Sequence, residues 1–342
     1  MDIKGIERRD LEDTLIEEGF VKFSAVQIYD WLYRKRIEDF SEMSNLSGKL
    51  REYLHDNFFI TGLELAKREK SVDGTEKFLF RLADGSFIES ALIPEKKRNT
   101  LCISTQVGCK FKCVFCSSGK AGFKRNLSVS EIVNQFLEVS GLIRPMKITN
   151  IVFMGVGEPL DNLDNLIKAI DIFMDNKGLY MGKRKICIST CGIIPGIYKL
   201  IDLNLGVSLS LSLHAAENQT RTRIMPVNSR YPLDELVRAI KAFIKRFKFP
   251  VMFEYILIKS LNSSREDATK LSKFLKNIDC KLNLIVYNRS DYFSWQPPAS
   301  EDIAAFCSIL KNNGIFYTLR KPRGQDINAA CGQLRAEFKR VR

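Results

Sequence analysis

The chain has 342 residues, of which 45% are hydrophobic and 27% charged, the composition of an ordinary globular protein with an ample core. No apolar run approaches the length of a membrane span, and Met1–Gly5 lacks the charge order and apolar stretch of a signal peptide. We therefore expect a cytoplasmic protein with no membrane partner, in a compartment where its nine cysteines stay reduced.

The charge balance suggests a polyanionic partner. Lysine and arginine total 53 against 40 aspartates and glutamates, which gives a net charge of +13. Nucleic acid is the first candidate for such a partner. The alternative is a generally basic cytosolic enzyme, so the charge alone does not decide between the two.

Residues 11–58 have the pattern of short helices. Val26, Ile28 and Leu32 lie on one apolar face, and basic residues such as Arg34 and Lys35 surround it. We expect a helical accessory domain over residues 1–60. Its basic face fits an RNA-binding role, and a packing appendage is the alternative.

A β-hairpin is expected next, within a linker region over residues 61–94. Lys77–Leu82 alternates like a strand, Ala83–Ser86 is a turn, and Phe87–Ile93 is a second strand. Glu89 is a carboxylate in this second, apolar strand. It either faces solvent on an edge strand or points into a site as a base.

Three cysteines, Cys109, Cys113 and Cys116, form a CxxxCxxC run in one short loop. Thiolates are soft ligands that hold zinc or iron–sulfur clusters. Zinc sites normally take their ligands from two separated CxxC-like pairs, and no second pair is present here. A cubane cluster held by three thiolates keeps one iron open, the arrangement that reduces S-adenosylmethionine (SAM) to a radical. The spacing favours radical SAM chemistry over zinc.

From residue 101 onward, strand and helix patterns alternate. Strands are expected at residues 101–105, 150–154, 185–189, 207–212, 252–258 and 282–287, and helices at 163–174, 233–246 and 267–275. Such alternation predicts a parallel sheet with helices outside it. The fold class is therefore α/β, a partial (βα)6 radical SAM barrel with an N-terminal helical accessory domain and a small β-hairpin extension. We expect the barrel core over residues 95–326 and a cysteine-containing C-terminal loop with a basic tail over 327–342.

Polar residues follow several predicted strands, where a barrel displays its chemistry. The second strand is followed by Gly155–Pro159, in which glycines allow close approach of a ligand. There Glu158 is placed to accept a bond from the SAM amino group. The third strand ends at Ser189, the fourth at Ser212–His214, and the sixth is followed by Asn288.

Six motifs together resemble those of one known family. They are Gln106–Cys109, Cys113–Lys120, Arg125–Leu127, Gly155–Leu160, Ser212–His214 and Ala329–Leu334. Spread over nearly the whole chain, they resemble the RlmN/Cfr family of radical SAM adenine methyltransferases that act on RNA. Lys120 and Phe123 are more similar to the branch that makes C2-methyladenine than to the branch that makes C8-methyladenine.

The resemblance implies a set of cofactor ligands. Cys109, Cys113 and Cys116 would hold one 4Fe–4S cluster. SAM, two molecules per turnover, would contact residues that match the family's binding positions. These are Gly157, Glu158, Ser189, Ser212, Leu213, His214 and Asn288.

It also implies three catalytic residues. Cys331 would first be methylated by one SAM, and a 5′-deoxyadenosyl radical from a second SAM would then take hydrogen from that methyl group. The carbon radical would add to adenine C2, because this carbon is not nucleophilic enough to attack SAM itself. Glu89 would accept the proton, and Cys102 would release the product by forming a transient disulfide with Cys331.

The implied substrates are 23S rRNA and transfer RNA, and the implied partners include an external one-electron reductant. The protein would act as a monomer. Two alternatives remain open at this point: a C8-methylating enzyme with the same cofactors, and a zinc-stabilised RNA-binding protein without catalysis.

Overall fold

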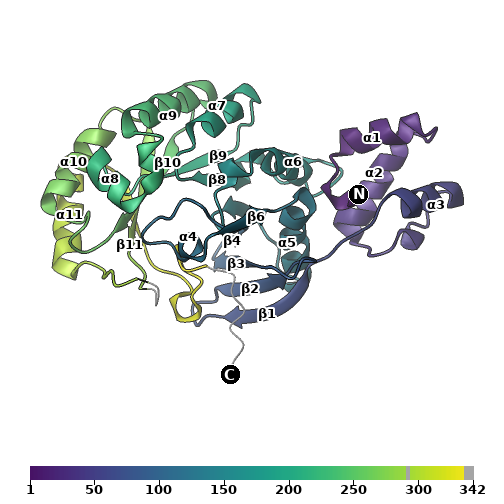
Figure 1. Cartoon of the computed structure of the whole chain (residues 1–342), viewed down its shortest axis with the longest axis horizontal. Helices are drawn as coiled ribbons and strands as arrows, with labels where there is room; N and C mark the ends of the chain where they lie inside the picture. Colours follow the sequence, from purple (N-terminus) through teal and green to yellow (C-terminus); the bar gives the residue numbers. More distant parts are fainter. Residues whose placement is uncertain (290–292, 335–342) are drawn as a thin grey trace.

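The computed structural model describes residues 1–289 and 293–334 and is dominated by one large mixed sheet (Figure 1). Within these residues the sheet has ten strands, in the spatial order β1 (Glu64–Lys70), β2 (Glu76–Arg81), β3 (Phe87–Glu95), β4 (Arg98–Cys102), β7 (Asn150–Phe153), β8 (Ile186–Thr190), β9 (Ser208–Ser212), β10 (Val251–Leu257), β11 (Cys280–Val286) and β12 (Tyr317–Arg320). The pairs from β4 to β12 are all parallel. In the described part of the chain β1 and β12 do not pair with each other, so the barrel is open.

Helices join the successive parallel strands and cover the outside of the sheet (Figure 1). They are α5 (Val129–Leu142), α6 (Leu163–Met174), α7 (Ile194–Asp202), α9 (Leu233–Phe247), α10 (Arg265–Leu275) and α11 (Ser300–Asn312). This arrangement confirms the predicted partial (βα)6 barrel. Helix α7 was not predicted, because Gly196 lowers its helix propensity. A Cβ on Gly196 would lie 2.9 Å from Leu160 Cβ, so close packing explains the glycine.

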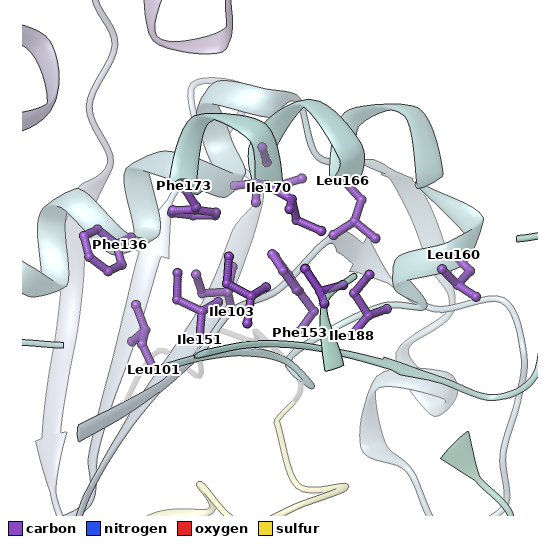
Figure 2. Packing of buried hydrophobic residues seen from close by; sticks show 14 of the residues in the cluster. Leu101, Ile103, Phe136, Ile151, Phe153, Leu160, Leu166, Ile170, Phe173 and Ile188 are labelled. Carbon is purple, nitrogen blue, oxygen red and sulfur yellow. The ribbon is translucent and has the colours of Figure 1, made fainter. Parts of the chain in front are cut away.

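The packing of α5 and α6 on the sheet shows why every second residue of a strand is a large apolar one (Figure 2). Ile151 and Phe153 of β7 face α6 and are fully buried, and Phe153 lies near Phe173 of that helix. The intervening residue, Val152, and the next one, Met154, take the opposite face. Burying each large apolar side chain contributes about 1.5–3 kcal/mol. The inner face of the sheet is thereby left to line the barrel interior.

The predicted hairpin is present and is larger than expected. Strands β2 and β3 pair antiparallel with Leu79 opposite Glu89, and β3 pairs antiparallel with β4. Strand β1, which is rich in charged residues and was not predicted, adds to β2. Glu89 is buried in a central strand, so the solvent-facing alternative for this residue is wrong.

The N-terminal residues form the expected short helices, α1 (Arg8–Glu17), α2 (Phe23–Tyr29) and α3 (Gly48–Asn57). These helices lie at the side of α5 and α6 (Figure 1). Polar contacts attach them to the loop after α6: Arg8 Nε donates to Asp175 Oδ2 at 2.8 Å, and Arg34 Nη2 donates to the Asn176 carbonyl at 3.0 Å. Across residues 1–289 and 293–334, no helix has both the length and the apolar character needed to cross a bilayer.

Candidate active site

A cavity of about 150 Å³ lies at the carboxyl ends of the parallel strands. This is the edge where α/β barrels place their chemistry. Its wall combines side chains from the cysteine loop, the strand ends and the C-terminal loop. The lining residues include Cys109, Cys113, Cys116, Gly157, Glu158, Ser189, Cys191, Ser212, His214, Glu254 and Cys331.

The cysteine loop is held by a small hairpin and a short helix. Strands β5 (Gln106–Gly108) and β6 (Phe123–Asn126) pair antiparallel, and α4 (Ser117–Ala121) lies between them. Gly108 has φ +77°, and a Cβ there would lie 1.7 Å from the Gly122 carbonyl oxygen. Only glycine therefore permits this crossing. The crossing presents the cysteines that follow to the cavity.

The three thiols of this loop lie close enough to influence one another. Burial raises the pKa of Cys109 to about 12. The pKa of Cys113 is raised by burial first and then by the thiols of Cys116 and Cys109, and the Arg221 guanidinium opposes the shift. A bound metal reverses this balance, because the thiolate is the form that coordinates.

The donor set fits an iron–sulfur cluster. In the described part of the chain, no three Cys, His, Asp or Glu side chains converge closely enough to hold one metal ion. A cubane spreads its thiolates over separate irons, so its ligands need not converge on a point. Three thiols round one cavity beside a buried guanidinium match that requirement.

Glu158 is fixed at the end of β7 by hydrogen bonds on both sides. Its carboxylate accepts the Cys191 N–H at 2.7 Å and the Leu160 N–H at 3.1 Å, and its own N–H donates to Gln106 Oε1 at 2.9 Å. Burial raises its pKa, and the bond from Cys191 opposes the shift. Gly157 has φ +107°, and a Cβ there would lie 2.6 Å from Gln106 Cβ. The result is a backbone cradle with a rigid acceptor in its wall.

The fourth parallel strand presents a neutral imidazole. His214 Nδ1 accepts the Ile256 N–H at 3.1 Å, which leaves its proton on Nε2. Burial and the nearby Arg221 cation lower its pKa to about 3. Its ring stands edge-on to Phe115 of the cysteine loop, with ring centroids 4.7 Å apart. The neighbouring Ser189 and Ser212 also line the cavity, whereas Leu213 is fully buried beside it.

The C-terminal loop brings Cys331 to the same cavity. Ser117 N–H donates to the Gly332 carbonyl at 2.8 Å, and Ser118 Oγ donates to the Leu334 carbonyl at 2.7 Å. Both bonds dock this loop against the helix that follows the cluster cysteines. Asn288 does not line the cavity, and its Nδ2 donates to the Cys331 carbonyl at 3.4 Å.

Cys102 lies behind Cys331 and outside the cavity lining. It is buried in a small apolar cluster with Ala91 and Leu334. Burial and the adjacent Cys331 thiol raise its pKa to about 12. All nine cysteines, every one within the described residues, are free thiols, so the expected disulfide between these two is not formed in this structure.

Glu89 faces the same side of the sheet as Cys102. Ala91 is the register partner of Cys102, and Glu89 precedes Ala91 by two residues on β3. Alternate residues of a strand share a face, so the side chains of Glu89 and Cys102 point the same way. Glu89 Oε1 forms an ion pair with Lys77 Nζ at 3.4 Å and is not part of the cavity wall.

Two buried residues at the site, Arg221 and Glu254, were not predicted from the sequence. Arg221 lies in a polar stretch that carries no local signal of burial. Glu254 interrupts an apolar strand, the same signal that singled out Glu89. Its Oε1 accepts bonds from Ser210 Oγ and Asn283 Nδ2, whereas Oε2 is buried without a hydrogen-bond partner in the described chain. This unpartnered oxygen on a cavity-lining residue offers an acceptor to a ligand hydroxyl or amine.

An open parallel barrel with a three-cysteine loop at its strand ends defines a radical SAM enzyme. Residues 103–271 match the Radical SAM superfamily, and residues 1–60 match the ribosomal RNA large subunit methyltransferase N-terminal domain. The protein uses a 4Fe–4S cluster and SAM.

Similar proteins show to which family of radical SAM enzymes the chain belongs. A dual-specificity RNA methyltransferase RlmN from Desulfotalea psychrophila is 43% identical, over 98% of this chain and 94% of that protein. A probable dual-specificity RNA methyltransferase RlmN from Bacillus thuringiensis is 42% identical, over 98% and 93%. The crystal structure of a radical SAM methyltransferase from Sphaerobacter thermophilus superposes with a TM-score of 0.93 at 37% identity, over 98% and 100%. The chain belongs to the RlmN family of dual-specificity RNA methyltransferases.

Proposed function

We propose that this protein methylates C2 of an adenine in 23S rRNA and in transfer RNA, with Cys331 carrying the methyl group. Family membership supports an RNA substrate and is consistent with the C2 position. Two molecules of SAM are consumed per turnover. An external one-electron reductant is required.

One observation carries this proposal: Cys331 opens onto the cavity that the cluster cysteines and the strand-end residues line. The contacts of Ser117 and Ser118 hold its loop against the cysteine motif. A thiol in this place can meet the same bound SAM that the rest of the wall holds. A structural zinc site would not explain why a further thiol is accessible from the same cavity.

The geometry of the wall supports the cofactor-binding roles of Glu158, Ser189, Ser212 and His214, whereas the roles of Leu213 and Asn288 rest on the family resemblance. Cys109, Cys113 and Cys116 ligate the cluster. Glu158 accepts from the SAM amino group in the cradle beside Gly157, and His214 offers its Nε2 proton as a donor. Further contacts come from Ser189, Ser212, Leu213 and Asn288, and the free oxygen of Glu254 accepts from SAM as well.

Bound by Cys109, Cys113 and Cys116, a 4Fe–4S cluster would supply one-electron reduction of SAM, and SAM would serve both as methyl donor and as source of a 5′-deoxyadenosyl radical. Cys331 acts as the nucleophile that takes the methyl group, and its thiolate is the reactive form. Glu89 accepts the proton that leaves C2. Cys102 would then form a disulfide with Cys331 while the Cys331 S–CH2 bond of the adduct breaks and the methylene carbon takes a proton to become the product methyl group. The unpaired electron of the adduct would pass to the oxidised cluster, and the external reductant would restore the two thiols. The position of Cys102 behind Cys331 supports this role.

The remaining parts of the chain serve the RNA. We assign RNA binding to the helical domain over residues 1–60, helped by the net charge of +13. The hairpin region spans residues 61–94, the barrel core 95–326, and the catalytic cysteine loop with its basic tail 327–342. The protein works as a monomer in the cytoplasm.

Two substitutions test the proposal. The protein is reconstituted without oxygen and given reductant, SAM and RNA. With Cys331→Ala, no methyl group reaches the protein, as measured by intact mass. With Cys102→Ala, a covalent RNA–protein adduct accumulates.

Mass analysis of the modified nucleoside separates the alternatives. The expected product is 2-methyladenosine, whereas 8-methyladenosine would favour the C8 enzyme. A colourless protein that carries zinc and forms no 5′-deoxyadenosine would contradict the proposal altogether.

A further inference from the structure

Arg221 is a fully buried cation directly beneath the active site. It lies on α8 (Asn218–Ile224) and is 0% exposed. Four groups accept its hydrogen bonds: the carbonyls of Cys191 (2.7 Å), Ser212 (3.1 Å) and Leu213 (3.1 Å), and Asn228 Oδ1 (2.9 Å). All four acceptors are neutral. They accept hydrogen bonds from the guanidinium, but none of them carries a negative charge that balances its positive charge.

A buried charge normally has an opposite charge beside it, because desolvating an unpaired ion costs several kcal/mol. Across residues 1–289 and 293–334, no carboxylate forms an ion pair with Arg221. Burial lowers its pKa to about 10, so it still carries its proton at neutral pH. A bound anionic group can therefore supply its counter-charge.

The surroundings of Arg221 identify that group. Arg221 Nη2 donates to the Cys191 carbonyl at 2.7 Å, and Cys191 lines the same cavity as the three cysteines of the loop. Helix α8 is also joined to the cysteine loop, because the Val114 N–H donates to the Ile224 carbonyl at 3.0 Å. Arg221 therefore lies beside the place where three cysteines become thiolates when they bind iron.

We propose that Arg221 is the counter-charge of the iron–sulfur cluster, a positioning residue whose cation raises the reduction potential of the cluster. The proposal rests on the assignment of Cys109, Cys113 and Cys116 as its ligands. Reduction adds one negative charge to an already anionic cluster. A fixed cation therefore stabilises the reduced form more than the oxidised form, and it does so strongly in a water-poor interior.

The guanidinium also explains why this charge comes from arginine. Its fork donates to carbonyls after β8 and at the end of β9, and so holds the Cys191 and Ser212–Leu213 segments together. A purely structural role would depend on this fork, whereas the proposed electrostatic role depends on the charge. The two roles can be separated by substitution.

Three variants make the separation: Arg221→Gln, Arg221→Lys and Asn228→Asp. Each is reconstituted without oxygen, analysed for iron and sulfide, and titrated against redox mediators with detection by electron paramagnetic resonance. For Arg221→Gln we expect the ratio of reduced to oxidised cluster at a fixed potential to fall at least about tenfold, which is 59 mV for one electron. Arg221→Lys keeps the charge and should stay within about threefold of the wild type.

Asn228→Asp keeps Arg221 and places a carboxylate of the same size against it. Its new charge is balanced by the guanidinium, but the oxygen that replaces Nδ2 loses the bonds to Asn218 and Thr222, so a urea denaturation curve first establishes that the fold is retained. In the folded variant the ratio should fall as in Arg221→Gln. This variant decides the matter if Arg221→Gln does not load a cluster. The proposal would be overturned if Arg221→Gln and Asn228→Asp both kept the wild-type reduction potential. It would also be overturned if the ratio of reduced to oxidised cluster fell as far in Arg221→Lys as in Arg221→Gln.

Failure of the proposed function would be seen separately. Cys113→Ala should lose the cluster. If the wild type loads no cluster, or if Cys113→Ala still holds four irons, the ligand assignment is wrong. If the wild type and the variants load fully and the potentials do not follow the charge at Arg221, only the role of Arg221 is wrong.

Discussion

Replacing Gly157 by alanine tests whether the backbone cradle beside Glu158 is as tight as the structure indicates. Two effects add at this position. The φ of +107° is a conformation that residues with a Cβ rarely adopt, and the strain is about 1–3 kcal/mol. The new Cβ would also lie 2.6 Å from Gln106 Cβ and 2.9 Å from Gln106 N, an overlap that costs about another 1–3 kcal/mol.

Gly85 provides a matched control. It has φ +76° in the turn between β2 and β3, and nothing lies within 4 Å of the Cβ that alanine would add. Gly85→Ala should therefore show only the backbone strain, about 1–2 kcal/mol. Gly157→Ala should lose about 2–6 kcal/mol of unfolding free energy, measurably more than the control.

The two proteins are compared by urea denaturation of the apo form and by SAM binding to the reconstituted form. Moving Gln106 also removes the acceptor of the Glu158 N–H, so the dissociation constant for SAM should rise at least about tenfold in Gly157→Ala and stay unchanged in Gly85→Ala. Equal losses of stability in the two variants, or unchanged SAM affinity in Gly157→Ala, would refute the close approach at Gly157.

Three further predictions concern other parts of the site. Glu254→Gln should leave the free energy of unfolding within about 1 kcal/mol of the wild type. It should weaken SAM binding about tenfold or more, as measured by calorimetry, because the free Oε2 acceptor becomes a donor. Unchanged affinity would exclude the contact between Glu254 and SAM. His214 is neutral in the fold with a pKa of about 3 against about 6.5 when unfolded, so the unfolded state binds the proton first as pH falls. The free energy of unfolding should therefore fall between pH 6.5 and 3 by up to about 1.4 kcal/mol per pH unit. His214→Asn, in which asparagine tolerates the positive φ of 58° at this residue, should show a smaller dependence of unfolding free energy on pH in denaturation curves. An equal dependence in the variant and the wild type would contradict this. Ser118→Ala should cost about 1 kcal/mol and make Cys331 react faster with iodoacetamide, as followed by mass spectrometry, since it loses the bond to the Leu334 carbonyl; an unchanged rate would mean that this bond does not hold the loop.

Much of this protein could be predicted because its signals are local. Strand and helix periods predicted the parallel barrel, and the spacing of Cys109, Cys113 and Cys116 predicted a cluster loop at the end of its first strand. In a parallel barrel all strand ends meet at one edge, so Glu158 and His214 could be placed together from the sequence. Cys331 is different, because only the family resemblance, and no spacing, pointed to it.

Only the tertiary structure decided which residues are buried and which distant segments meet. It brought the loop of Cys331 against the helix after Cys116, placed Cys102 behind it, and buried Glu89 in a central strand. It also enclosed Arg221, whose polar sequence neighbours resemble an ordinary surface helix. The physical reason is that burial and charge compensation depend on what packs around a residue from far along the chain, whereas helix and strand patterns depend on neighbours a few residues away.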